Sequence, residues 1–465
     1  MGNKWSFKSL NELGVQLIDC MHKTPSAQVS GVPYIGIPQM KNGEIDFEAS
    51  PRLISESDYK LWTEKANPQY GDIILSRRCN PGETAFVSGQ TRFALGQNLV
   101  ILRTNGLSIT AEYLRWALNS SYWWDEVEKY KNPGAIFDSL KCGDIPNFQI
   151  PAPPLRIQNK ISSVLDSLTD RINLNNKVNR TLEQMSQTLF KSWFVDFDPV
   201  IDNALDAGNP IPEALQSRAE LRQKVRNSAD FKPLPADIRA LFPAEFEETE
   251  LGWVPKGWQH KNAEEIATIS IGKTPPRNQK ECFSDKKGSN YTWVSIRDLG
   301  NCNVFIKESS EYLTTDAVNN YNVKIVPKGA VLLSFKLTIG RIAIADNILT
   351  TNEAIAHFYN MKHGVNKEYL YSYLQHFDYD TLGSTSSIAT AVNSKIIRRI
   401  PVLLPDADIL HQYKISTDII FKRISFNNRN IYDLTALRDT LLPKLISGEL
   451  SLEDLPDLID QTEPA

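Results

Sequence analysis

The residues that could support catalysis occur in a few suggestive patterns, and each pattern lacks a part that its chemistry needs. Gly272-Lys273-Thr274 is similar to the end of a phosphate-binding loop. The first glycine of such a loop would fall at position 267, which is Ala267. Pro275-Pro276 then stands where the helix that receives the phosphate should begin. The sequence therefore argues against a nucleotide site here.

A second pattern, Asn67-Pro68-Gln69-Tyr70, is similar to the Asn-Pro-Pro-aromatic loop with which amino-methyltransferases hold a flipped adenine. It lacks the second proline, and no glycine-rich turn for a methyl donor precedes it. A turn before a strand at Ile73 is the better interpretation. The histidines form no HExxH motif, and no serine stands in a GxSxG elbow. These absences favour a protein that binds over one that catalyses.

Basic and amide side chains recur in loops near the ends of predicted strands. Arginine suits guanine and asparagine or glutamine suits adenine at major-groove edges, while lysine, serine and threonine suit phosphates. A single residue of this kind is more often a solvated surface group, so the indication of recognition is their recurrence in loops of two related segments. The candidates for DNA contact are Lys23, Thr24, Lys41, Arg77, Arg78, Asn80, Gln97 and Asn98, followed by Lys273, Thr274, Arg277, Arg297, Lys336, Arg341 and Asn352.

Short apolar runs predict the strands that position these loops. Gly71–Ser76 and Asn98–Leu102 are such runs, bounded by turn-forming residues, and a helix is expected at Thr110–Val127. Prolines at 151, 153 and 154 suit the entry to a further helix. Residues 199–257 predict a connector with one short helix at 212–227, which packs on another part of the chain instead of forming its own core.

Two long amphipathic helices are predicted from apolar spacing. No proline interrupts the chain from about Arg156 to Phe194, which predicts one helix of roughly 58 Å at 1.5 Å per residue. Its apolar residues step by three and four: Ile157, Ile161, Val164, Leu168, Ile172, Val178, Leu182, Met185 and Leu189. A second stripe repeats this spacing: Ile420, Ile424, Leu434, Leu437, Leu441 and Leu445. We expect the two helices to pair with each other.

The second helix repeats part of the first. Arg171–Lys177 (RINLNNK) returns 252 residues later as Arg423–Arg429 (RISFNNR). Asn175 and Asn427 continue the two apolar stripes, and a polar residue in a helix seam weakens a coiled coil but fixes its register. Alternatively, the helix face drifts there and the asparagines face water. Both interpretations remain open.

The globular segments repeat as well, so the chain is a duplication in the order globular segment, helix, connector, globular segment, helix. The predicted fold class is α+β. The matching pairs are Gly71–Ser76 with Gly329–Ser334, Thr110–Leu114 with Asn366–Leu370, and Ile150-Pro151 with Ile400-Pro401.

Length and composition fit a globular protein of several domains. No stretch approaches ~18 uncharged apolar residues, and no signal-like core follows Met1, so a cytoplasmic protein without membrane contact is expected. The five cysteines form no CxxC motif, so reduced thiols are expected and a zinc site is not. The net charge is −4, but Glu449–Ala465 holds six acids and no base, which leaves +2 for the remainder. Any DNA contact must therefore be local.

These features together resemble the DNA-specificity (S) subunit of type I restriction–modification systems, over essentially the whole chain. The most specific pieces are Ile271–Pro275 (IGKTP), Leu189–Phe197 (LFKSWFVDF) and Leu442–Leu450 (LPKLISGEL). Pro153-Pro154-Leu155 with Gln158 fits the start of the first long helix. The second long helix departs from the pattern, with Leu404-Pro405-Asp406 and Gln412.

The resemblance implies two target recognition domains joined by two long antiparallel helices that form a coiled coil, with an internal pseudo-twofold repeat. Each domain would contact one half of a bipartite, asymmetric site in double-stranded DNA, and the helices would set the number of unread base pairs between the halves. The expected segments are 1–150 and 258–400 for the domains, 151–198 and 401–448 for the helices, 199–257 for the connector and 449–465 for the acidic tail.

The resemblance also implies a division of labour. This chain would be non-catalytic and would hold no cofactor or metal. Two modification (methyltransferase) subunits would dock on the helices and transfer methyl from S-adenosylmethionine to adenine N6. Restriction subunits, which are also translocases, would use ATP and Mg²⁺.

Two other classes of function stay open at this stage. A self-contained DNA methyltransferase with a cryptic cofactor site would show methyl transfer by the isolated chain, and the missing glycine-rich loop counts against it. An assembly scaffold that uses only its helices would bind DNA without sequence preference even when its partners are present.

Overall fold

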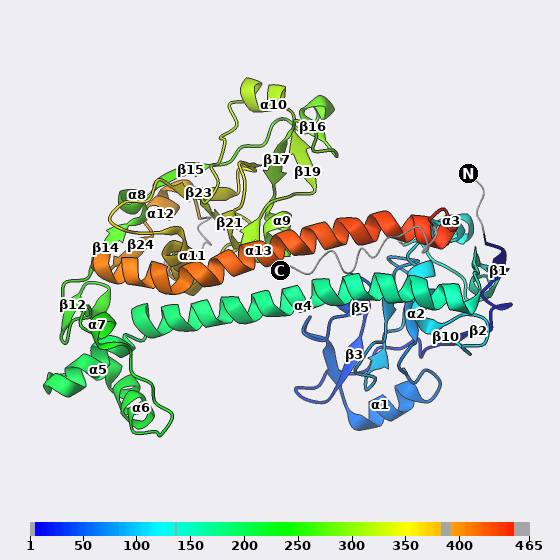
Figure 1. Ribbon diagram of the computed structural model, residues 1–465, viewed down its shortest axis with the longest axis horizontal. Helices are drawn as coiled ribbons and strands as arrows, with labels where there is room; N and C mark the ends of the chain where they lie inside the picture. Colours follow the sequence, from blue (N-terminus) through cyan, green and yellow to red (C-terminus); the bar gives the residue numbers. More distant parts are fainter. Residues whose placement is uncertain (1–4, 135–136, 383–391, 451–465) are drawn as a thin grey trace. The chain divides into compact units, whose positions relative to one another are not determined.

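The structure, a computed structural model, describes residues 5–134, 137–382 and 392–450 (Figure 1). The chain forms two compact units. Unit 1 comprises Met1–Asn173 with Ile431–Ala465, and unit 2 comprises Leu174–Asn430. Most of the acidic tail expected at 449–465 lies outside the described residues. Each unit combines small sheets with helices, as the predicted α+β class requires.

Unit 1 is built on a six-stranded sheet in the order β2-β10-β7-β8-β5-β4, with a three-stranded sheet β6-β3-β9 and the pair β1-β11. Neighbouring strands are antiparallel except β5 with β8 and β3 with β9. The strands are β1 Phe7–Ser9, β2 Val15–Asp19, β3 Val32–Ile35, β4 Met40–Lys41, β5 Glu44–Ile45, β6 Arg52–Ile54, β7 Ile73–Ser76, β8 Thr84–Phe86, β9 Ala94–Leu95, β10 Leu99–Thr104 and β11 Gln149–Pro151. The helices before α4 are α1 Glu56–Thr63, α2 Ala111–Ala117 and α3 Ser121–Tyr130.

Unit 2 repeats this topology. Its main sheet has the order β15-β23-β20-β21-β18, its second sheet β16-β19-β17-β22, and the pairs β14-β24 and β12-β13 complete it. The parallel pairs are again two, β18 with β21 and β17 with β22. The strands are β12 Phe246–Thr249, β13 Gly252–Pro255, β14 Gln259–Asn262, β15 Thr268–Ile271, β16 Phe283–Ser284, β17 Tyr291–Val294, β18 Phe305–Ile306, β19 Glu311–Leu313, β20 Val331–Ser334, β21 Ile342–Ala345, β22 Thr350–Thr351, β23 Ile355–Tyr359 and β24 Pro401–Leu404.

Eight shorter helices lie in the part of unit 2 that the structure describes, and α5 to α7 belong to the connector. They are α5 Asp198–Ala207, α6 Gln216–Arg226, α7 Ala236–Arg239, α8 Ala263–Ile266, α9 Ile296–Asn301, α10 Thr315–Asn320 and α11 Lys367–His376, with α12 Ser394–Arg398 before the last strand. Single 3-10 turns are at Ile37–Gln39, Ile145–Asn147, Glu213–Leu215, Lys280–Cys282 and Tyr379–Leu382.

The two long helices form as the apolar spacing predicts. α4 runs from Leu155 to Phe194, and α13 from Ala407 to Ser447. The start of α4 is fixed by Gln158, which is fully buried. Its Oε1 accepts from the N–H of Thr110 at 2.9 Å, and its Nε2 donates to the carbonyls of Ser108 and Pro153 at 2.9 and 2.8 Å.

Each unit contains part of both long helices, and the apolar stripes are buried in its core. In unit 1, Ile161 and Leu165 of α4 share a core with Leu441 and Leu445 of α13. In unit 2, Phe194 near the end of α4 packs edge-on against Tyr413 near the start of α13, with ring centroids 5.1 Å apart. In unit 2, Asn179 contacts Asn427 and the later Phe194 contacts the earlier Tyr413, so the two helix segments run antiparallel.

The asparagines of the repeated stretch have different environments. Asn427 is 0% exposed, and its Nδ2 donates to Oδ1 of Asn179 at 2.9 Å. The Nδ2 of Asn179 in turn donates to Oδ1 of Asn428 at 2.7 Å. Asn175 is only half-buried and takes no part in this cluster. Asn179 lies seven residues after Ile172, so a heptad count identifies it where a single step of three led to Asn175. A role in fixing the register stays a prediction.

Two local expectations were wrong. The helix expected at Thr110–Val127 is two helices, α2 and α3, because Asn119 and Ser120 form a turn in which the Ser120 hydroxyl donates to the carbonyl of Ala117 at 2.7 Å. The turn allows Trp123 to be buried. The connector holds more structure than one helix, since α5 begins at Asp198 directly after the helix break and β12 and β13 form a hairpin.

The connector packs on unit 2, as expected, and is stiffened by ion pairs. Phe242 and Val254 belong to the core of unit 2. Acids spaced by four on α5 meet arginines spaced by four on α6, which pairs the helices side by side. The pairs are Asp198 with Arg218 (2.8 and 2.7 Å), Asp202 with Arg222 (2.9 and 2.8 Å) and Asp206 with Arg226.

Replacing Asn179 and Asn427 together by leucine is expected to raise the free energy of unfolding, because a buried polar pair is exchanged for apolar packing. Asn427→Leu alone should lower it by about 1–3 kcal/mol, since the buried Oδ1 of Asn179 loses its donor. Thermal and urea unfolding of the wild type, both single variants and the double variant would measure this. A double variant as unstable as the sum of the singles would contradict it.

Candidate nucleic-acid interface

The turn after the central strand of the main sheet has the same hydrogen-bonded frame in both units. It spans eight residues, Ser76–Glu83 between β7 and β8 and Ser334–Arg341 between β20 and β21. The first N–H donates to the last carbonyl at 2.8 and 2.9 Å, and the glycine at the seventh position donates to the first carbonyl at 3.0 and 3.1 Å. The serine hydroxyl donates to a carbonyl inside the turn at 2.9 and 2.6 Å. We call these segments the turn frames.

The residues at the tips of the two turn frames have different side chains but the same backbone conformation. The fourth residue has a positive φ in both, 69° at Cys79 and 61° at Leu337. Around it, unit 1 presents Arg78 and Asn80, both exposed, and unit 2 presents Lys336 and Thr338, also exposed. The same backbone thus carries two different sets of side chains.

In unit 1 most of the predicted residues gather at this end of the sheet. The N–H of Arg77 donates to the carbonyl of Asn98 at 2.9 Å. The Tyr34 hydroxyl donates to the carbonyl of Lys23 and accepts from the N–H of Gln97, both at 3.2 Å. The loops that hold Lys23, Thr24, Gln97 and Asn98 therefore lie beside the turn frame with Arg78 and Asn80. Lys23, Thr24 and Gln97 are exposed.

Lys41 does not join this group. It lies in the β4–β5 hairpin, and the neighbouring Glu44 pairs with Phe86 at the far end of β8. Its ammonium is bound to Asp46 at 2.9 Å. Arg77 belongs to the group by position, and its side chain is only 8% exposed, whereas its neighbours Arg78 and Asn80 are exposed. A DNA contact by Arg77 stays a prediction.

In unit 2 the predicted residues also converge on one end of the main sheet. The N–H of Lys273 donates to the carbonyl of Thr351 at 2.9 Å, and the N–H of Asn352 donates to the carbonyl of Val294 at 3.0 Å. These bonds bring the loops with Lys273, Thr274 and Asn352 next to α9, which carries the exposed Arg297. Lys336 and Arg341 stand in the turn frame itself.

Three of these residues are held by bonds within the chain. Arg277 binds both carboxylate oxygens of Glu311 at 2.9 and 3.0 Å and lies 4.5 Å from the ring centre of Trp293. Arg341 donates to the carbonyl of Ile296 at 2.7 Å. The side chain of Asn352 accepts from a backbone N–H two residues on. These bonds fix the three side chains in the loops. Lys273, Arg297 and Lys336 are exposed, and they make no side-chain hydrogen bond or ion pair within the described part of the chain.

Comparison with known proteins identifies the repeat. A family model, the type I restriction modification DNA specificity domain, matches residues 3–184 and 255–425. The chain belongs to this family. It is a DNA-specificity subunit, and subunits of this family are in general non-catalytic. Neither the self-contained methyltransferase nor the scaffold is favoured.

Relatives of this DNA-specificity subunit span nearly its full length. It is 27% identical over 406 residues to the type I restriction enzyme HindI specificity subunit of Haemophilus influenzae, covering 82% of this chain and 86% of that protein. It is 24% identical over 476 residues to the MjaIX specificity subunit of Methanocaldococcus jannaschii, covering 97% and 94%. The solved S subunit from M. genitalium has the same fold, with a TM-score of 0.50, 15% identity and coverage of 95% and 96%.

One acidic residue of the specificity subunit was missed by the sequence analysis. The N–H of Phe335 donates to the carbonyl of Ala354 at 2.9 Å, the counterpart of the bond from Arg77 to Asn98. Glu353 is therefore equivalent to Gln97. It accepts from the Thr274 hydroxyl, and its pKa is lowered: burial acts to raise it, but this hydrogen bond and the charges of Lys336 and Arg277 outweigh burial. Only the alignment of backbone bonds reveals this position, because a search for basic and amide residues passes over an acid.

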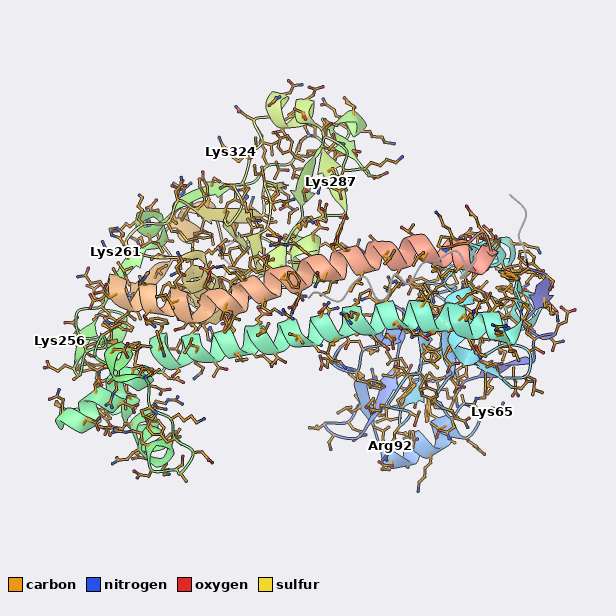
Figure 2. All side chains as sticks on the ribbon, in the orientation of Figure 1. Lys65, Arg92, Lys256, Lys261, Lys287 and Lys324 are labelled. Atoms are coloured by element: carbon orange, nitrogen blue, oxygen red, sulfur yellow. The ribbon has the colours of Figure 1, made fainter. Side chains whose placement is uncertain are left out.

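Positive charge alone does not mark the interface. Figure 2 labels basic side chains of both units, Lys65 and Arg92 in unit 1 and Lys256, Lys261, Lys287 and Lys324 in unit 2, and none of these residues belongs to a turn frame. Several of those labelled there are neutralised by ion pairs, namely Arg92 with Glu56, Lys256 with Glu245 and Lys287 with Glu308. The candidate interface of the specificity subunit therefore rests on loop geometry.

Among the residues that the structure describes, one group of possible metal ligands is found, and it lies in unit 1. Atoms of Asp19, Cys20 and His22 lie within 4.8 Å of one another. Both ring nitrogens of His22 are engaged, by the carbonyl of Gln97 at 3.1 Å and by Asp19 at 3.0 Å. Burial raises the pKa of Cys20 to about 11, which keeps the thiol protonated. Asp19 and His22 thus bind each other, while the Cys20 thiol donates to the carbonyl of Gly96 at 3.2 Å. None of the helices in the described part of the chain has the length and hydropathy to span a membrane.

A buried histidine supports the loops of unit 2. The ring of His357 bridges Ser270 at 2.9 Å and Thr351 at 2.6 Å, and Thr351 holds the Lys273 backbone. Burial lowers the pKa of His357 from 6.5 to about 3. The imidazole is thus neutral in the folded subunit at physiological pH, and it must take up a proton only when the chain unfolds in acid.

This lowered pKa gives a pH dependence of stability. Between pH 6.5 and about 3 the unfolded state binds one proton more than the folded state at His357. The contribution of neutral His357 to the free energy of unfolding is fully present above pH 6.5. It is lost as the pH falls below 6.5, with a slope of about 1.4 kcal/mol per pH unit. Urea unfolding across this range should show a shallower slope in His357→Gln, whose amide can still bridge Ser270 and Thr351. His260, whose pKa is also lowered by burial, is present in both proteins and cancels. An unchanged slope would refute the assignment.

Proposed function

We propose that the chain contacts a bipartite, asymmetric site in double-stranded DNA, with one half-site bound by the loops at the turn frame of each unit. The observation that carries this proposal is the repetition of one backbone frame with different exposed side chains. The shared backbone frame positions the side chains that would contact the bases. Recognition residues are often found on loops that a rigid scaffold holds in place.

The equivalent positions suit different bases. Gln97 in unit 1 has an amide, which can make two hydrogen bonds with adenine, while Glu353 in unit 2 has a carboxylate, which can accept from the amino group of cytosine. The third and fifth positions of the turn frame differ as well: they are Arg78 and Asn80 in unit 1, and Lys336 and Thr338 in unit 2. Because the side chains at equivalent positions differ between the units, the two half-sites differ in sequence, and the full site is asymmetric. Nearby lysines hold the phosphates and fix the register.

The chemistry belongs to partner subunits in this proposal. Two modification subunits dock on the long helices and supply S-adenosylmethionine for transfer to adenine N6, with one adenine flipped in each half-site. Restriction and translocase subunits use ATP and Mg²⁺. Docking is supported by apolar side chains that α13 leaves exposed, Ile415 at 54%, Ile419 at 74% and Phe426 at 47%. The helices α4 and α13, which contribute residues to both units, set the number of unread base pairs.

Mapping of methylated adenines tests the proposal as a whole. DNA from cells that express the chain with its modification subunits should carry N6-methyladenine at one asymmetric site made of two parts with a fixed gap. Omitting the chain should abolish methylation at that site. Methyl transfer by the isolated chain would indicate a self-contained methyltransferase instead. Methylation without a common sequence would indicate a scaffold.

A matched pair of lysines tests the location of the interface. Lys336 lies in the turn frame of unit 2, while Lys362 is exposed after β23, at the opposite end of the same sheet. Lys336→Ala should weaken DNA binding by the assembled complex and reduce the slope of log affinity against log salt by about 1, as expected for one phosphate contact. Lys362→Ala should leave both unchanged. Equal effects of the two variants would place the interface elsewhere.

A further inference from the structure

Leu337 lies at the tip of the turn frame of unit 2, where two effects lower the stability of the folded chain: the exposure of its side chain and its backbone conformation. Its side chain is 100% exposed, so its apolar surface remains in water. Its φ is 61°, in the left-handed region that an aliphatic residue rarely adopts. Glycine or asparagine would occupy this position with less strain. The leucine therefore gives the folded chain nothing that the structure records.

The strain is imposed by the frame and does not come from the side chain. Cys79 has nearly the same φ, 69°, at the equivalent place. In both units the residue at this place lies between two that are bonded to each other, since the N–H of Thr338 donates to the carbonyl of Lys336 at 2.7 Å and Asn80 to Arg78 at 2.9 Å. Strained residues held by their surroundings are frequent at ligand-binding positions.

The surroundings of Leu337 indicate what it contacts. Lys336 precedes it, and the neighbouring loops present Lys273 and the exposed Arg297. Exposed cations around an apolar side chain suit a partner that is a polyanion and that also carries an apolar group on its surface. A protein surface fits this combination less well. In the major groove of DNA, the C5 methyl of thymine is the apolar group among the base edges.

We propose that Leu337 contacts a thymine C5 methyl in the half-site bound by unit 2, and so determines specificity at that base pair. This inference rests on the proposed function. The lysines beside it hold the phosphates while the rigid turn frame holds the leucine against the base edge. A cytosine at the same place would offer no methyl group and would leave the leucine against a polar edge.

The test uses the chain assembled with its modification subunits and duplexes that contain the methylated site. Each thymine of the half-site is replaced in turn by deoxyuridine, which lacks only the methyl group. One such replacement should weaken wild-type binding about fourfold, the factor that corresponds to about 0.8 kcal/mol for one buried methyl group. The Leu337→Gly complex should lose this sensitivity and should tolerate cytosine there.

Controls separate this contact from other effects. Leu337→Gly should melt at or above the wild-type temperature, since glycine relieves the strain, so lost discrimination cannot be attributed to unfolding. Ile348→Ala removes another exposed apolar side chain of unit 2, 58% exposed and at the far end of the main sheet, and should keep the sensitivity.

Three outcomes would overturn the inference. Wild type could bind all deoxyuridine duplexes equally, Leu337→Gly could retain the sensitivity, or it could lose assembly with the modification subunits while keeping its base preference, which would indicate a protein contact. A wild-type complex without any preferred site would instead refute the proposed function, and that result appears before any variant is used.

Discussion

The burial of one apolar stripe on α4 is the interaction on which the rest of the structure depends. Ile161 and Leu165 enter the core of unit 1, while Phe190, Trp193 and Phe194 enter that of unit 2. Neither core is complete without this helix, and each is closed by a segment of α13. Because side chains in a core are close-packed, a shift of α4 along its axis would disturb both cores at once. One continuous helix therefore contributes to the cores of both units.

On these cores the chain builds the same frame twice and varies only its surface. The strand order, the two parallel pairs and the eight-residue turn recur, although the sequences have diverged. Backbone hydrogen bonds depend little on side-chain identity, so they persist while exposed residues change. This separation lets Gln97, whose amide both donates and accepts, and Glu353, whose carboxylate only accepts, occupy the same position of the fold.

Periodic features were predictable from the sequence. The bounds of α4 and the strand β7 followed from apolar spacing, and the duplication followed from matched segments such as Arg171–Lys177 and Arg423–Arg429. Features set by tertiary context were not. The break between α2 and α3 depends on burying Trp123, and the partner of Asn427 depends on the register of the helix pair. Arg277 has the right type for base contact, but its pairing with Glu311 joins residues 34 apart. Leu337 and Glu353 were not identified from the sequence, because only basic, amide and hydroxyl side chains were considered as candidates for DNA contact.

The turn frame has a consequence for how such a protein can change. Both frames have eight residues and share three backbone hydrogen bonds, and the residues at their tips are exposed. Substitutions at the tip therefore alter the exposed chemistry at little cost in stability, and an exchange of one frame for the other by recombination within the gene keeps chain length and backbone geometry intact. The exposed chemistry of one unit can therefore change while the other unit keeps its own, which makes the frame a unit of evolutionary variation.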